Sequence, residues 1–452
     1  MSGDPPTEGG PDDPFEGLEG IEGLEDLEGL EGLEGLEGLE GLEGLGDLGE
    51  TGETDEPSGF GGLGGFGGLG DIPLIGDLMR TLQSAAPGAN QAREVGRAIA
   101  CGGVSEPNID PSQRITIEQL VRVAELRVAD ATGLQPAPGA ALRVEVVNRA
   151  GWSDRTVSDY EHLFGALNKS ISASLEPDLD DTPGDPMAAM LAGISKMIGP
   201  TMLALTTGAM VGRLAQHALG GYVLPVPRPA GKPMLIALPN VDEFSQEWSL
   251  DADDVRLWVC VHEAVYCAVF GVDHVRDAVS DLLVRHASAF ETNPRRIEEL
   301  LGDFDPGTAG PEAMARLQSE LGSPDALLGA VRSPAQEALL PQMTALVAAI
   351  TGYVDFTMDR IGADLIGSYD RLSEALRRHR VEASASDRFV ERLLGLELDQ
   401  TQYERGAAFA AGVVERAGTD GLRRLFTHPD NLPTPAEVDA AGLWLARIDL
   451  PR

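Results

Sequence analysis

One apolar segment holds residue types that could carry out hydrolytic chemistry. Residues Leu257–Tyr266 read Leu-Trp-Val-Cys-Val-His-Glu-Ala-Val-Tyr, which places His262 and Glu263 inside a run that should be buried. Burying either group without a partner is costly. In zinc-peptidase helices, two histidines four residues apart bind Zn²⁺, and the Glu after the first polarises a water as general base. Because Tyr266 stands at the second ligand position, this pattern is one histidine short.

Other catalytic patterns do not compete with this segment. His274 lies twelve residues after His262, about 18 Å along a helix axis, so only a sharp turn near Gly271 would bring it back. The remaining histidines lack ligand-like spacing, and the sequence has no G-x-S-x-G elbow and no P-loop. Cys260 and Cys267 are seven residues apart and are expected to be apolar core residues.

The elements that must position the segment are predominantly helical. Asp251 is the expected N-cap of a helix over 252–270, with Asp254 at the third position in a capping-box-like arrangement. Only 142–147 and 234–238 read as strands, with 222–227 as a connection between helices. The sequence therefore predicts a mainly α fold with a small β element. Further helices are expected at 72–84, 91–100, 115–132, 152–167, 275–289, 295–301, 311–321, 334–360, 369–380, 386–394, 401–417 and 421–426.

Charge divides the chain of 452 residues unevenly, although its formal total is −39. Residues 1–79 hold 22 Asp and Glu and no Lys or Arg, which leaves 34 basic and 51 acidic residues in the other 373. Nucleic-acid binding needs a basic face, so a nucleic-acid partner is not expected. Three cysteines are too few for a disulfide framework.

Residues 1–70 contain a Glu-Gly-Leu repeat followed by a Gly-rich linker, and residues 71–452 contain the folded part. Glycine at every third position opposes helix formation, so the acidic tail is expected to be disordered. The folded part is expected as one helical domain or as two lobes, 71–235 and 236–452. The apolar stretch 187–223 is interrupted by Lys196 and Pro200 and predicts buried helices, not a membrane span. Without a recognisable signal peptide, the sequence predicts a cytoplasmic protein.

Several longer pieces of the chain resemble an actinobacterial family of zincin-like metallopeptidases, whose members are described as hydrolases or associated with deazaflavin-coenzyme biosynthesis. The resemblance runs from about Ala92 to Ile448. It implies a zincin-like fold and a zinc cofactor. The matching pieces are 149–157 (RAGWSDRTV), 212–225, Pro239-Asn240, 256–270, 393–406 (LLGLELDQTQYERG) and 429–437 (PDNLPTPAE).

The resemblance also implies where zinc would bind. The family motif H-E-x-x-H corresponds to His262–Tyr266, and a later Glu-Gly-x-x-Asp pattern, which supplies a third ligand and an outer support, corresponds to Thr351–Asp355. This chain keeps His262, Glu263 and Asp355 but departs at Tyr266 and Thr351. A zinc site needs three or four protein ligands, and a neutral phenol is a poor one. Zinc is therefore expected to be absent or weakly bound.

Three hypotheses follow for the function. In the first, the protein is a non-catalytic pseudo-peptidase that binds a peptide or protein in the old cleft; His262 donates to Asp355, Glu263 is hydrogen-bonded, and Tyr266 fills the volume of zinc and histidine. In the second, it is a zinc hydrolase with His262, Tyr266 and a further ligand as the metal site and Glu263 as the catalytic base. In the third, it is an interaction protein that acts through its acidic repeat. The sequence names no substrate and no oligomeric state.

Overall fold

The computed structural model describes residues 88–137, 139–174, 204–290, 332–381, 385–396 and 398–450. All of them belong to the second of two units of the chain, which comprises residues 87–452. Several predictions lie outside the described residues. They are the acidic tail, the helices expected at 72–84, 295–301 and 311–321, and residues 187–203 of the stretch expected to form buried helices.

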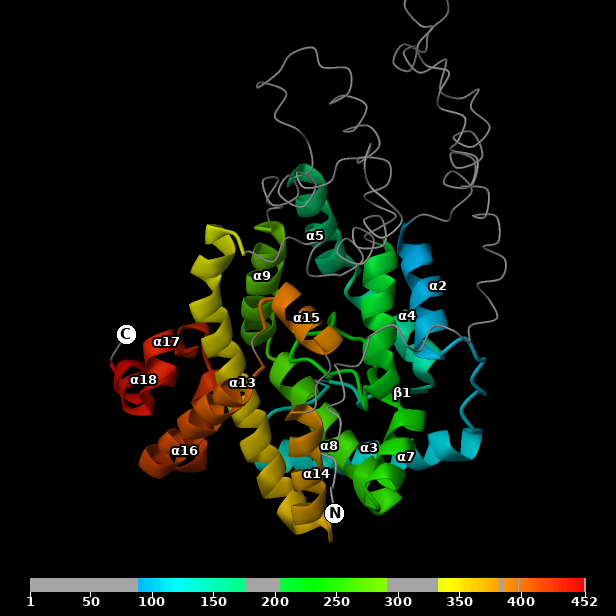
Figure 1. Ribbon diagram of the computed structural model, residues 1–452. Helices are drawn as coiled ribbons and strands as arrows, with labels where there is room; N and C mark the ends of the chain where they lie inside the picture. The colour runs from blue at the N-terminus through cyan, green and yellow to red at the C-terminus, as the bar shows by residue number, and fades with distance from the viewer. Residues whose placement is uncertain are drawn as a thin grey trace, which may run out of the picture. The chain divides into compact units, whose positions relative to one another are not determined.

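The described part is mainly α-helical, as the sequence predicts (Figure 1). A further helix occupies residues 204–217. The elements are α2 (Gly88–Ala100), α3 (Pro111–Thr132), β1 (Val144–Val147), α4 (Arg149–Asp159), α5 (Glu161–Ser174), β2 (Met234–Ala237), α7 (Leu238–Glu247), α8 (Ala252–Phe270), α9 (Asp273–Ser288), α13 (Pro334–Leu365), α14 (Tyr369–Val381), α15 (Ala385–Leu393), α16 (Gln400–Arg423), two 3₁₀ turns (Arg424–Phe426, Pro429–Asn431), α17 (Pro435–Val438) and α18 (Ala441–Ile448).

The small β element is a parallel pair. β1 and β2 pair in the register Val144 with Met234 through Val147 with Ala237. On the other side of β2, Gly220 forms an antiparallel bridge with Ile236. β2 is fully buried, whereas the first half of β1 is only half-buried. β2 therefore lies between β1 and the chain segment around Gly220.

The longest helix, α13, is the central support of the C-terminal half (Figure 1). It packs against α8, α9 and α16. Its crossing with α16 is very close, because a Cβ atom on Gly352 would overlap the backbone of Gly406, and a Cβ on Gly406 would overlap the carbonyl of Ala348. Among the described residues, α13 is the single unbroken helix that is long and apolar enough to cross a bilayer, and 67% of its apolar window is buried inside the protein. The helices α8 and α9, which are bent by 89° relative to each other, meet the same criteria only when they are taken together as one span.

Several predicted boundaries differ from the structure for local reasons. The single helix predicted at 152–167 is two helices, because the chain leaves helical geometry at Tyr160. Residue Leu238, predicted to end a strand, begins α7, with Pro239 in its first turn, where proline fits a helix. The helices predicted at 401–417 and 421–426 are joined across Gly418, whose φ of 68° marks a kink.

Candidate functional site

The helix that carries His262 begins and ends where the sequence predicts. The Asp251 carboxylate accepts hydrogen bonds from the N–H groups of Asp253 and Asp254 (3.0 and 3.1 Å), which satisfies two free donors of the first turn. The second half of the predicted capping box does not form. The Asp254 carboxylate instead accepts from the N–H and hydroxyl of Ser368 (3.3 and 2.5 Å). Asp254 therefore ties the start of α8 to the start of α14.

His262 lies in an aromatic environment on α8. Its ring stacks on Trp258 with 4.8 Å between ring centroids and meets Tyr266 edge-on at 5.0 Å. Its Nδ1 atom lies 3.5 Å from Oε1 of Glu263, and its side chain is 13% exposed. Among the described residues it has no hydrogen bond to Asp355. The imidazole is therefore held mainly by ring packing.

Glu263, the one acidic residue of the segment 257–266, is buried, with 1% of its surface exposed. One carboxylate oxygen accepts from the N–H of Gly221 (2.9 Å) and the other from the N–H of Tyr222 (3.2 Å). A Cβ atom on Gly220 would overlap this carboxylate. Both oxygens are therefore engaged by the turn beneath them, which agrees with the prediction that Glu263 is hydrogen-bonded.

The turn that receives Glu263 is fixed by residues from the motifs that carry the family resemblance. Trp152 donates from Nε1 to the carbonyl of Gly220 (2.8 Å). Asn240 donates to the carbonyls of Ala215 and Ala218 (2.8 and 2.7 Å) and accepts from Arg149 (2.6 Å). Two of the matching pieces, 149–157 and Pro239-Asn240, thus hold residues 215–220 of a third.

A buried ion pair lies on the other side of the same turn. Arg228 and Asp159 form an ion pair with side chains 4% and 1% exposed, and Lys232 lies 3.0 Å from the same carboxylate. A Cβ on Gly221 would come within 2.6 Å of Nη1 of Arg228. Gly220 and Gly221 therefore have no side chain because Glu263 and Arg228 occupy the space on either side.

Tyr266 occupies the position where the family motif has its second histidine. Its ring stacks on Tyr222 and on Phe270, with centroid distances of 5.1 and 5.9 Å. Burial raises its pKa well above the usual value, and the acidic groups of Tyr403 and Asp355 raise it further. The phenol is therefore neutral at physiological pH and is part of an aromatic stack.

The two residues predicted from α13 have other partners. Thr351 is buried and donates to the carbonyls of Val347 and Ala348 of its own helix (3.0 and 3.1 Å). Asp355 forms a two-pronged ion pair with Arg380 of α14, with N–O distances of 3.1 Å. The Arg380 guanidinium also lies 5.2 Å above the ring of Tyr403. The expected bond from His262 to Asp355 is replaced by this pair.

Charge balance in the pair favours Arg380 as a permanent cation. Burial works most strongly against the charge of Arg380, but Asp355, Tyr403 and Tyr266 together outweigh burial and raise the pKa of the guanidinium. Burial also raises the pKa of Tyr403 to about 12, although Arg380 opposes that shift. A fixed positive charge therefore stands beside Asp355, Tyr403 and Tyr266.

The donor set does not fit a zinc ion. Zinc needs three or four nitrogen, sulfur or carboxylate ligands, and here the phenol of Tyr266 keeps its proton, the Thr351 hydroxyl is bound within its helix, and Asp355 is paired with Arg380. Among the residues that the structure describes, no three His, Cys, Asp or Glu side chains are grouped so as to hold a metal. No catalytic step is therefore assigned to a metal here.

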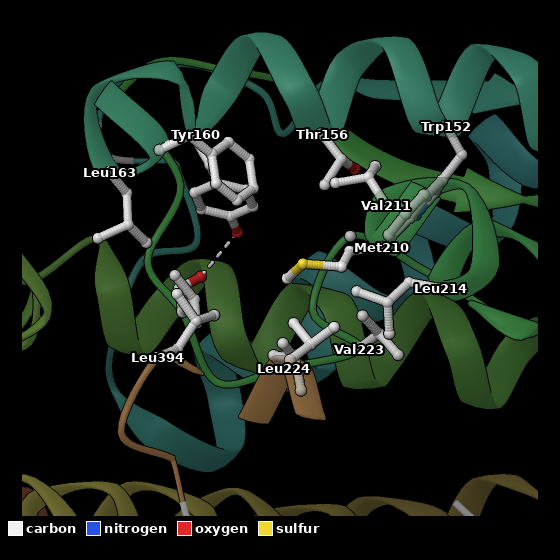
Figure 2. A pocket seen from close by; sticks show the side chains of 14 residues that line it. Trp152, Thr156, Tyr160, Leu163, Met210, Val211, Leu214, Val223, Leu224 and Leu394 are labelled. Carbon is white, nitrogen blue, oxygen red and sulfur yellow. Dashed lines mark hydrogen bonds between the residues drawn. The ribbon is translucent and has the colours of Figure 1, made fainter. Parts of the chain in front are cut away.

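A small cavity adjoins the turn but is unsuited to a substrate. It has a volume of about 30 Å³, which is space for a few water molecules. Figure 2 shows Trp152, Met210 and Leu214 around it, with Tyr160 donating to the carbonyl of Val226 (3.0 Å). Its walls are almost entirely apolar, and within the described part of the chain the buried hydroxyl of Thr156 has no hydrogen-bond partner.

The described part is a mainly helical scaffold in which α8, with its His-Glu pair, packs against α13. The chain belongs to the family of zincin-like metallopeptidases, whose sequence profile matches residues 89–445. This finding confirms the predicted zincin-like helical fold.

A solved structure supports the same architecture. It is the crystal structure of a candidate hydrolase with a novel fold from Chloroflexus aurantiacus, 23% identical, with a TM-score of 0.51. The similarity covers 80% of this chain and 99% of the other. At that identity it shows the fold alone. No curated protein matches the chain significantly.

Sequence reasoning missed Arg380 and Tyr403 as partners of the site. Arg380 ends a predicted helix, and Tyr403 lies within the matched piece 393–406. The unusual signal was the retained Asp355 without its expected ligand neighbours, because a half-buried acid needs a new cation or donor.

Proposed function

We propose that this protein is a non-hydrolytic member of the zincin-like metallopeptidase family that works by binding a peptide or protein. The observation that supports the proposal most directly is the burial of Glu263, which is 1% exposed and whose carboxylate is held by the N–H groups of Gly221 and Tyr222. A general base needs a free oxygen within hydrogen-bond reach of a water or substrate proton.

The replacement of the metal ligands by a self-sufficient set of contacts supports the same proposal. Tyr266 fills its position with ring stacking, and Arg380 supplies Asp355 with a positive partner. Tyr266 and Thr351, which stand at the two departed ligand positions, and Asp355, which stands at the outer support, therefore all have partners within the protein. A residual metal site made by His262, Tyr266 and another ligand is the competing proposal, and it requires the phenol to lose its proton despite burial.

Zinc content separates the two proposals. The wild-type protein and His262→Ala are loaded with zinc, dialysed exhaustively and assayed by elemental mass spectrometry. We expect no stoichiometric zinc in either protein and no cleavage of a quenched fluorescent peptide library. About one zinc per chain, lost in His262→Ala, would establish the hydrolase alternative.

Three further points extend the proposal. We place the protein in the cytoplasm, in line with its three free cysteines, since disulfides are rare in that compartment. An association with deazaflavin-coenzyme biosynthesis stays a prediction of the family resemblance. The acidic repeat can be tested separately from the site by deleting residues 1–70, because all the described site residues belong to the unit of residues 87–452.

A further inference from the structure

One face of α8 carries a ridge of side chains that includes the candidate site. Side chains four residues apart follow one another along a helix, and here they are Asp254, Trp258, His262 and Tyr266. The ridge spans twelve residues, about 18 Å along the helix axis. It contains the two positions at which the family motif has its histidines. Whatever lies on this ridge therefore controls access to the candidate site.

Helix α14 turns back from the end of α13 and lies along this ridge (Figure 1). At its start, the hydroxyl and N–H of Ser368 donate to Asp254, the first member of the ridge (2.5 and 3.3 Å). At its end, the charge of Arg380 acts on the phenol of Tyr266, the last member. Ser368 and Arg380 are also twelve residues apart. The helix between them therefore matches the ridge in length, runs parallel to α8 and extends over His262.

The end of α14 also contacts the helices on either side of α8. His379 meets Phe244 of α7 edge-on at 5.3 Å, and its ring centroid lies 6.4 Å from that of His217. The next residue, Arg380, pairs with Asp355 of α13. Both α7 and α13 pack on α8. Two adjacent residues of α14 therefore reach both walls of a groove whose floor is the ridge of α8.

Helix α14 has the sequence pattern of a helix that binds in a groove. Its buried apolar side chains lie at spacings of three and four residues and are Leu372, Ala375 and Leu376. Amphipathic helices are recognised through this spacing. The ion pair that holds its end is partly exposed, with Arg380 at 29% and Asp355 at 33%. A small apolar contact and a partly exposed ion pair suit a helix that opens by itself.

We propose that α14 is an internal ligand of this groove, and that a partner protein binds when α14 leaves, by placing an amphipathic helix on the α8 ridge with a basic residue against Asp355. The inference rests on the proposed binding function, and it names the site and the regulation of that binding. Arg380 shows the chemistry that Asp355 requires, because a half-buried acid needs a cation. The partner's apparent affinity is then lowered by the fraction of molecules in which α14 is closed.

Hydrogen exchange on the full chain tests whether α14 opens by itself. We expect the amides of 369–380 to exchange at least about 100-fold faster than those of 258–266, because α14 opens while α8 stays folded. Arg380→Gln removes the ion pair with α13 and should speed the exchange of α14 about 5-fold. The matched control is Arg378→Gln, at an exposed residue that pairs with Glu374 of its own helix, and it should change the rate less than about 2-fold. If α14 and α8 exchange at one rate, by global unfolding, the inference is wrong.

The probe for the groove is a capped, fluorescein-labelled peptide with the sequence of residues 368–381, added to the full chain and measured by fluorescence anisotropy. It carries its own arginine, so it should bind Arg380→Gln with a Kd below about 1 mM, about 5-fold more tightly than the wild type. Asp355→Asn also frees α14 but removes the acceptor for that arginine, so it should bind about 5-fold more weakly than Arg380→Gln. A peptide with Leu372→Asp should not bind. Equal binding to Arg380→Gln and Asp355→Asn, or no binding to Arg380→Gln at about 1 mM, would overturn the inference.

This inference and the proposed function fail on different results. If α14 does not open and the protein holds no zinc, the inference fails and the non-hydrolytic function stands. If Arg380→Gln, with the ridge uncovered, holds about one zinc per chain or cleaves the peptide, the proposed function fails although α14 opens.

Discussion

Replacing Glu263 by glutamine tests whether this residue is structural or catalytic. The carboxylate accepts the N–H groups of Gly221 and Tyr222 at 2.9 and 3.2 Å in a site that is 1% exposed. Glutamine keeps one acceptor and turns a donor toward the other N–H, so one bond is lost and a buried donor is left unpaired. The free energy of unfolding should fall by about 2–4 kcal/mol.

The assay is urea denaturation at pH 7, with the transition midpoint compared at constant slope. Glu415→Gln is the matched control, because this glutamate is exposed and its substitution should change stability by less than about 0.5 kcal/mol. Catalytic residues are commonly replaced without loss of stability, and sometimes with a gain. If Glu263→Gln is as stable as the wild type, the structural role inferred for Glu263 is wrong.

Three further predictions follow from the same structure. Gly220→Ala should lower the free energy of unfolding by about 3 kcal/mol, because its Cβ would overlap Glu263. The control Gly165→Ala, which has open space around its Cβ, should be neutral or stabilising by up to about 1 kcal/mol. Equal urea midpoints for the two variants would contradict this prediction. Burial lowers the pKa of His286 from 6.5 to about 4, so the unfolded chain takes up the proton first as the pH falls. About 3 kcal/mol of stability that is present above pH 6.5 should therefore be lost as the pH falls toward 4. His286→Leu should flatten this part of the profile of stability against pH, and an unchanged slope would refute the assignment. Asp355 and Arg380 are 33% and 29% exposed, so a double-mutant cycle with Asp355→Ala and Arg380→Ala should give a coupling near 1 kcal/mol, and a coupling of zero would show that the pair does not stabilise the site.

The features that local sequence determines were predictable. The helix over 252–270 and its Asp251 cap follow from the capping residue and the apolar run behind it, and the structure confirms both. The two strands of the β element were also placed to within two residues, because short apolar runs rich in branched residues stand between turn signals.

The partners of the candidate site were not predictable, because they depend on side chains that are distant in sequence. Asp355 was expected to accept from His262, but it meets Arg380, which lies 25 residues away on another helix. Asp254 was expected to complete a capping box, but the hydroxyl of Ser368 reaches it across 114 residues. Each acid takes a strong donor that tertiary packing brings within reach, and helical periodicity does not contain that information.

The close crossing of α13 and α16 makes the site sensitive to substitutions at two glycines that have no polar side chain of their own. Gly352 lies between Thr351 and Asp355 on α13, and Gly406 lies three residues after Tyr403 on α16. Because neither glycine has a side chain, the backbones of α13 and α16 are in direct contact at the crossing, and this contact sets the angle between the two helices. Any larger residue at either glycine would tilt one helix against the other and shift Asp355 relative to Tyr403. At these two positions, each within one helical turn of the site, an apolar substitution would therefore disturb the electrostatic arrangement around Arg380.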